Sequence, residues 1–181
     1  LAAASCTEYL DIKPYGKEIP ETAEDFSALL HKEVFQIDQG EAEIVGNSSS
    51  VTDLECYCDN LETNLTSYPL YVGAQVDSKQ TTYSRLYESI RNCNLVIGYM
   101  EEKGTEEADN NLSVAHALRG VCYYQLLRQF CMPVVAGRYE ELDGVPIVTE
   151  FDMEAKPARS SYGDVVEQIE ADFAKAKEYG I

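Results

Sequence analysis

Apolar residues recur every three or four positions between Asp77 and Pro133, a spacing that predicts two long amphipathic helices. One face of the first helix comprises Tyr83, Leu86, Tyr87, Ile90, Cys93, Asn94, Ile97 and Met100. The second helix carries two stripes on opposite sides, one of Ala115, Leu118, Cys122, Leu126 and Phe130 and the other of Ala117, Val121 and Tyr124. A helix that is apolar on two faces is usually packed between other helices. The short link Gly104–Asp109 predicts an antiparallel hairpin.

Capping patterns mark the start of further helices. Thr22 and Asp25 are three residues apart, a variant of the capping box, and precede an apolar face of Phe26, Leu29, Leu30 and Phe35 that ends before Gly40. Ser161 and Asp164 repeat the pattern ahead of a last helix with Val165, Val166, Ile169, Phe173 and Ala176 on one face. Asp77 and Gln80 are candidate caps for the first hairpin helix.

The remaining segments are irregular. Residues 40–76 contain the loop Gly46–Ser50, a possible helical turn at Val51–Tyr57 and a Pro- and Gly-containing loop at Asn64–Gly73. Met132–Glu140 is a predicted loop, and Gly144–Thr149 is a predicted short extended segment. The fold class is therefore mainly all-α, a tetratricopeptide-like scaffold of helical hairpins with long loops.

The charge balance excludes some partners. With 14 basic and 32 acidic residues, the chain has a net charge of −18 and would be repelled by nucleic-acid phosphates and by anionic membrane surfaces. Nine acidic residues and no Lys or Arg lie between Glu33 and Ser78. A solvated acidic surface is the favoured interpretation of this stretch, with a cation site as the alternative.

Three tyrosines of the irregular region, Tyr57, Tyr68 and Tyr71, are the candidate ligand-binding residues. Long loops often carry function, and Tyr rings stack on the apolar faces of sugars while their hydroxyls find polar partners. The alternative is that each tyrosine simply covers the core beneath it, which is the more common fate of a single Tyr.

No arrangement of residues indicates catalysis. Neither the six cysteines nor His31 and His116 have zinc-ligand spacing, and no nucleophile or phosphate-loop motif is present, so we expect no enzyme, no metal and no cofactor. Asp53, Glu55 and Asp59 could pair as glycosidase carboxylates, but such groupings are common in an acidic loop. Cys93 and Cys122 fall on apolar faces of the hairpin; buried free thiols are favoured, and a disulfide between them is the alternative.

The first residues have the pattern of a processing site. Leu1–Ser5 followed by Cys6 is typical of the end of a bacterial lipoprotein signal peptide, in which the Cys is acylated after cleavage. Ala3 departs from the commonest residue at its position, and an ordinary N-terminal segment is the alternative. We expect residues 1–5 to end a signal peptide, residues 6–181 to form the domain, Cys6 to carry the lipid, and the chain to be part of a longer precursor.

Several motifs in series resemble the SusD/RagB family of nutrient-binding lipoproteins. They are Tyr83-x3-Tyr87-x2-Ile90-x2-Cys93-Asn94-x2-Ile97 and Ala115-x-Ala117-Leu118-Arg119-Gly120-x2-Tyr123-Tyr124-x-Leu126-x3-Phe130-x2-Pro133, flanked by Cys6 with Leu10–Pro14, by Gly144–Thr149, and by Arg159–Ser161 with the last helix. Departures from the family pattern occur at His116, Gly120 and Cys131, which are packing positions. The resemblance covers nearly the whole chain but only the N-terminal part of the longer family members, so the C-terminal part of the family fold is absent from this sequence.

The resemblance implies a cell-surface, lipid-anchored outer-membrane protein of a Bacteroidota organism. It would bind an oligosaccharide, or sometimes a peptide, and pass it to a SusC-like TonB-dependent transporter. The alternative is a helical-repeat scaffold lipoprotein that docks on a partner protein without binding nutrient.

Asn94 and Arg119 are polar residues on largely apolar helix faces. A buried polar group without a hydrogen bond costs about 1–3 kcal/mol. We therefore expect both to be structural, bonded to backbone carbonyls or to a carboxylate within the fold, and not to contact ligand.

Overall fold

The computed structural model describes residues 20–38, 72–100, 104–134, 139, 142–151 and 156–180, and the side chains of these residues outside 34–38 and 72–82. Four α-helices lie in these ranges: α1 (Ala23–Asp38), α3 (Val72–Tyr99), α4 (Glu106–Phe130) and α5 (Tyr162–Tyr179). The described residues contain no strand, only an isolated antiparallel bridge between Asp143 and Ser161. The prediction of a mainly all-α fold is confirmed.

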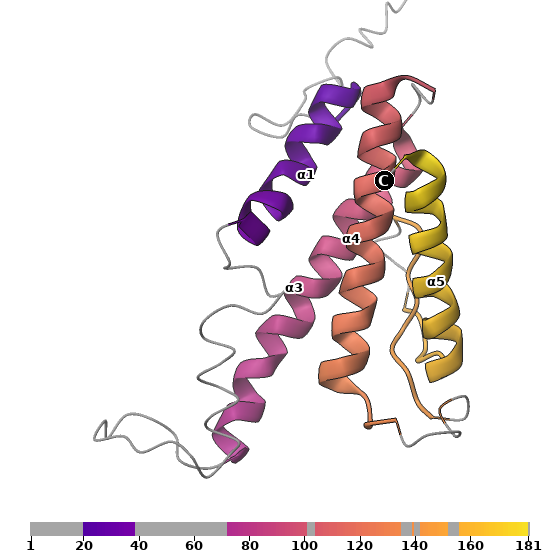
Figure 1. Ribbon diagram of the computed structural model, residues 1–181. Coiled ribbons are helices and arrows are strands. Elements are labelled where there is room, and N and C mark those ends of the chain that lie inside the picture. Colours follow the sequence, from indigo (N-terminus) through magenta and orange to yellow (C-terminus); the bar gives the residue numbers. More distant parts are fainter. Residues whose placement is uncertain are drawn as a thin grey trace, which may run out of the picture.

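Helix α4 is the centre of the arrangement. It contacts α1, α3 and α5, and α1 also contacts α3. Figure 1 shows α3 and α4 as a hairpin, with α5 running beside α4 and α1 lying on the other side. The expectation that α4 packs between other helices is therefore correct for its first stripe, whose Ala115, Leu118, Cys122 and Leu126 are buried. The second stripe is less covered, because Tyr124 is 53% exposed.

The predicted capping boxes both form. At the start of α1, the Thr22 N–H donates to Asp25 Oδ2 at 3.0 Å, and the Asp25 N–H donates to Thr22 Oγ1 at 3.2 Å. At the start of α5, the Ser161 N–H donates to Asp164 Oδ2 at 3.2 Å, and the Asp164 N–H donates to Ser161 Oγ at 3.0 Å. Each box satisfies backbone donors that the first helical turn leaves without acceptors.

Two predicted helix starts are wrong. Helix α3 begins at Val72, so Asp77 lies inside it and does not cap it. Gly73 falls in the first turn, where backbone N–H groups have no intrahelical acceptor in any case and a flexible residue costs little. Helix α4 begins at Glu106, with Thr105 as the N-cap. The acidic residues assigned to the link form its first turn, because negative charge is favourable at a helix N-terminus.

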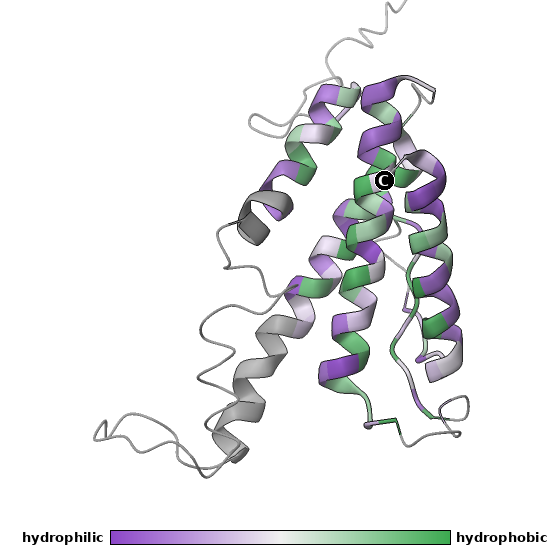
Figure 2. Ribbon diagram, viewed as in Figure 1, coloured by the Kyte–Doolittle hydropathy of each residue, from purple (hydrophilic) through white to green (hydrophobic). Residues whose placement is uncertain are grey.

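The helices share one hydrophobic core. Figure 2 shows hydrophobic positions gathered between the helices and hydrophilic positions turned outward. The largest fully buried apolar side chains of the core are Tyr123, Phe26, Leu86, Ile90, Leu112, Leu126, Val96, Val145 and Val165. Cys93 and Cys122 are free and buried within it, as expected. Burial raises the pKa of Cys93 to about 12, so its thiol stays protonated near neutral pH.

Buried hydrogen bonds attach the outer helices to the hairpin. Asn111 Nδ2 donates to the Ala23 carbonyl at 2.8 Å, linking α4 to the start of α1. Ser89 Oγ donates to a Glu33 carboxylate oxygen at 2.8 Å, linking α3 to α1. Among the described helices, none has the length and apolar character needed to cross a bilayer.

Candidate functional site

A buried ion pair joins α4 to α5. Arg119 and Asp172 are 5% and 1% exposed. The guanidinium is bidentate: Nε donates to Asp172 Oδ2 at 2.9 Å, and Nη2 donates to Asp172 Oδ1 at 2.6 Å. This fork-to-carboxylate geometry is the strong form of such a pair. Because both charged groups are buried away from water, each one is stabilised by the opposite charge of the other.

Two further side chains complete the bonding of the Asp172 carboxylate. His116 Nδ1 lies 2.9 Å from Oδ1, and Gln168 Nε2 donates to Oδ2 at 3.1 Å. The His116 ring also stacks on the Tyr179 ring, with centroids 6.0 Å apart. Burial alone would raise the pKa of Asp172, but the hydrogen bonds from His116 and Arg119 outweigh it and hold the pKa below its ordinary value.

Asn94 extends the network from the ion pair to the chain between α4 and α5. Arg119 Nη1 donates to Asn94 Oδ1 at 2.7 Å. Asn94 Nδ2 in turn donates to the Val148 and Glu150 carbonyls at 2.9 and 3.3 Å. Asn94 is 1% exposed. As the sequence predicts, Asn94 bonds to backbone carbonyls and Arg119 bonds to a carboxylate. The two side chains also bond to each other. That neither residue contacts ligand stays a prediction.

Two tyrosine hydroxyls hold the segment 144–150 against the hairpin. The Tyr123 hydroxyl donates to the Val148 carbonyl at 2.9 Å and accepts from the Val148 N–H at 2.7 Å. The Tyr87 hydroxyl donates to the Pro146 carbonyl at 2.7 Å. Burial raises the pKa of Tyr123 to about 12 and also raises the pKa of Tyr87, so both hydroxyls stay protonated and can donate.

The same segment approaches α5 closely at Gly144. A Cβ placed on Gly144 would lie 2.6 Å from the Ser161 carbonyl oxygen and 2.9 Å from Val165 Cγ2. The Gly144 N–H donates to the Ser160 carbonyl at 2.9 Å, and Arg159 Nε donates to the Gly144 carbonyl at 2.8 Å. The two residues of the Gly-x-Pro motif therefore have separate roles. Gly144 permits a close approach to α5 that no other residue would allow, and the Pro146 carbonyl accepts a hydrogen bond from Tyr87.

This buried cluster positions the chain and carries no open reactive group. Within the described residues, every buried side-chain nitrogen and oxygen has a hydrogen-bond partner. The described part of the chain also holds no group of three His, Cys, Asp or Glu residues arranged to bind a metal. The cluster can hold α5 and segment 144–150 on the hairpin, so its role is structural.

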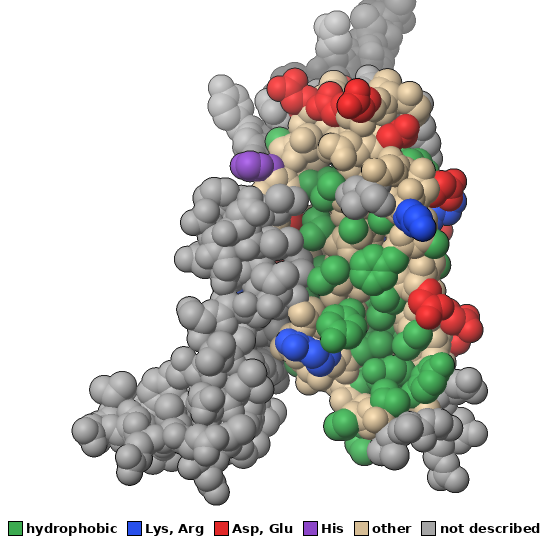
Figure 3. Space-filling model, viewed as in Figure 1, with side chains coloured by type: hydrophobic (Ala, Val, Ile, Leu, Met, Phe, Trp, Pro, Cys, Tyr) green, Lys and Arg blue, Asp and Glu red, His purple; other side chains and the backbone are tan. Residues whose placement is uncertain are grey.

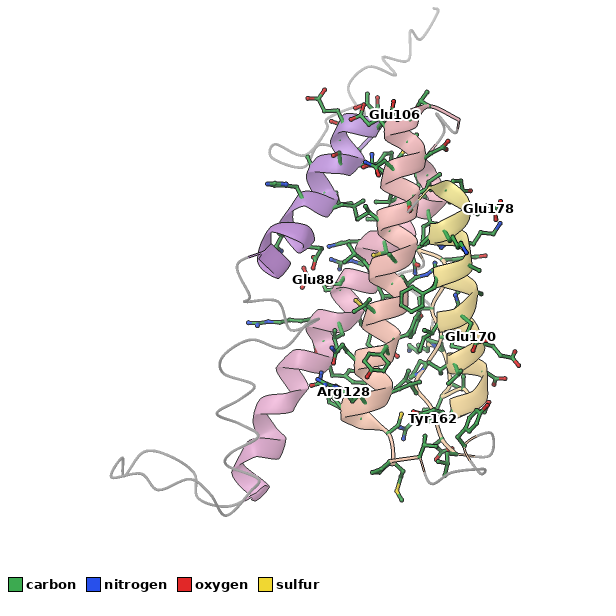
Figure 4. The ribbon with its side chains drawn as sticks, viewed as in Figure 1. Glu88, Glu106, Arg128, Tyr162, Glu170 and Glu178 are labelled. Carbon is green, nitrogen blue, oxygen red and sulfur yellow. The ribbon has the colours of Figure 1, made fainter. Side chains whose placement is uncertain are left out.

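A second feature of the described chain is an exposed apolar surface over α4 and α5. Figure 3 shows hydrophobic side chains spread across these two helices, with charged groups at the margins. Tyr124, Phe173 and Met132 are 53%, 43% and 70% exposed. Figure 4 places Arg128 of α4 and Tyr162 of α5 near the same end of the pair, and Glu106 and Glu178 near the other.

The residues predicted to bind lipid or ligand lie outside the described residues. They are Cys6, Tyr57, Tyr68 and Tyr71, and the same holds for Asp53, Glu55 and Asp59. Sequence reasoning did not assign roles to Asp172, His116 or Tyr123. Asp172 carried a usable signal: it falls on the buried stripe of Val165 and Ala176, where a lone acid requires a buried partner such as Arg119.

The chain belongs to a known family. Residues 8–179 match the model of the SusD-like family SusD-like_3, described as starch-binding and associating with the outer membrane. The SusD-like family consists of binding proteins without catalytic activity. No curated protein matches the chain.

Two solved structures are similar to it. A candidate sugar-binding protein from Bacteroides vulgatus has 20% identity and a TM-score of 0.63, and the match covers 90% of this chain and 38% of that one. A SusD superfamily protein from Bacteroides thetaiotaomicron has 28% identity and a TM-score of 0.49, with 54% of this chain and 22% of that one covered. The first match shows that the fold of this chain also forms part of a longer protein. The chain spans less than half the length of either protein.

Proposed function

We propose that the protein is a glycan-binding member of an outer-membrane nutrient-uptake system. The observation that carries this proposal is the family match over residues 8–179, whose description names starch binding and the outer membrane. The fold similarity to a candidate sugar-binding protein supports it. A net charge of −18 suits a neutral glycan, since its binding uses ring stacking and hydrogen bonds instead of attraction to an anion.

The proposed ligand platform is the tyrosine group Tyr57, Tyr68 and Tyr71. Affinity gel electrophoresis against starch and other common polysaccharides, followed by calorimetry with matching oligosaccharides, tests it on the full-length protein. We expect Tyr68→Ala or Tyr71→Ala to weaken binding by about tenfold or more, since loss of one stacking aromatic costs about 1–3 kcal/mol by analogy with base stacking. Tyr99→Ala is the matched control, because Tyr99 is 57% exposed on α3.

The outcome decides between two kinds of protein. Full affinity in both the Tyr68→Ala and the Tyr71→Ala variant would contradict the tyrosine platform and leave the glycan-binding proposal intact. If the full-length protein binds no polysaccharide, the glycan proposal is refuted, and a scaffold that docks on a partner protein is favoured. The exposed apolar surface over α4 and α5 is compatible with such docking.

The proposed anchor is a lipid on Cys6, with the mature chain at the cell surface. Cys6→Ser should move the protein from the membrane fraction to the soluble fraction, because stable anchoring of a chain of this kind depends on its acyl groups. Cys131→Ser controls for loss of a cysteine that is not at the proposed processing site. Persistence of the Cys6→Ser variant in the membrane fraction would rule out the anchor.

The proposed partner is a SusC-like TonB-dependent transporter of the outer membrane. Affinity purification of the tagged protein from detergent-solubilised outer membranes, with mass spectrometry, should recover such a transporter in about equimolar amount. Recovery of the protein alone under conditions that keep other outer-membrane complexes intact would count against this partner.

A further inference from the structure

We draw no further inference here: the strongest candidate, the exposed apolar surface over α4 and α5 around Tyr124, Phe173 and Met132, carries none because nothing in the described part of the structure shows what covers it.

Discussion

At the scale of single residues, the buried Arg119–Asp172 pair is where one substitution does most damage. Replacing Arg119 by Met leaves Asp172 without its cation and removes the donor to Asn94 Oδ1. Breaking one side of a buried pair typically costs about 3–5 kcal/mol. We expect Arg119→Met to lower the free energy of unfolding by that amount, measured by urea denaturation followed by circular dichroism.

Two comparisons make the Arg119 test specific. The double variant Arg119→Met/Asp172→Leu should be more stable than Arg119→Met alone, because it leaves no unpaired buried charge. Lys175→Met breaks an exposed pair with Glu178, whose side chain is 64% exposed, and should change stability by less than about 1 kcal/mol. A loss of about 1 kcal/mol or less for Arg119→Met would contradict the central position given to this pair.

Two glycines that each lie close to α5 or its N-cap should respond in opposite ways. A Cβ at Gly144 would meet the Ser161 backbone at 2.6 Å, so Gly144→Ala must displace the chain and should destabilise by about 1–3 kcal/mol. A Cβ at Gly120 would only touch Phe173 and Asp172 at 3.4–3.5 Å. Gly120→Ala should therefore be neutral or stabilise by up to about 1 kcal/mol, the usual gain of Ala over Gly inside a helix. Thermal unfolding of both variants measures the contrast, and destabilisation of equal size would refute it.

At the scale of elements, segment 144–150 is held by side chains of the hairpin and not by a sheet. Tyr123→Phe removes the hydroxyl that both donates to and accepts from Val148. We expect a loss of about 1–3 kcal/mol, because a partly buried backbone N–H and carbonyl each lose a partner. Hydrogen exchange of the Val148 amide should accelerate in this variant.

Tyr87→Phe is the matched control for that prediction. The Tyr87 hydroxyl donates to the Pro146 carbonyl, and proline has no N–H that could donate to it in return. Its loss should cost less than the loss of the Tyr123 hydroxyl and leave exchange at Val148 unchanged. A larger effect at Tyr87 than at Tyr123 would contradict the importance given to the two hydrogen bonds at Val148.

The elements also show which parts of the fold follow from sequence. The four helices and both capping boxes were predictable because helical spacing and caps are local signals. The start of α4 was misplaced because Glu106, Glu107 and Asp109 read equally well as a polar link and as an N-terminal turn. The pairing of Arg119 with Asp172 spans 53 positions. No periodicity within either helix specifies which partner a buried polar residue will meet.

At the scale of the whole molecule, the network centred on Asp172 gives folding a defined dependence on pH. The pKa of this carboxyl is below its ordinary value in the folded protein, and about 3.9 when unfolded. A lowered folded pKa means that the unfolded chain binds the proton more readily. The stability that Asp172 contributes is therefore fully present above about pH 4 and is lost as the pH falls through the lower, folded pKa.

Removing the titrating group should flatten this acid response. Asp172→Asn should be less stable than the original protein near pH 6, since the charge-assisted bonds from Arg119 and His116 are gone. Between pH 4 and pH 2, however, its free energy of unfolding should fall less steeply, because one proton-linked group has been removed. Glu170→Gln removes one negative charge from the exposed side of α5 and controls for net charge. Urea denaturation across this pH range compares the three proteins. If the free energy of unfolding has the same pH dependence in the original protein and in Asp172→Asn, protonation of other groups causes the loss of stability in acid. The buried Arg119–Asp172 pair would then not determine stability at low pH.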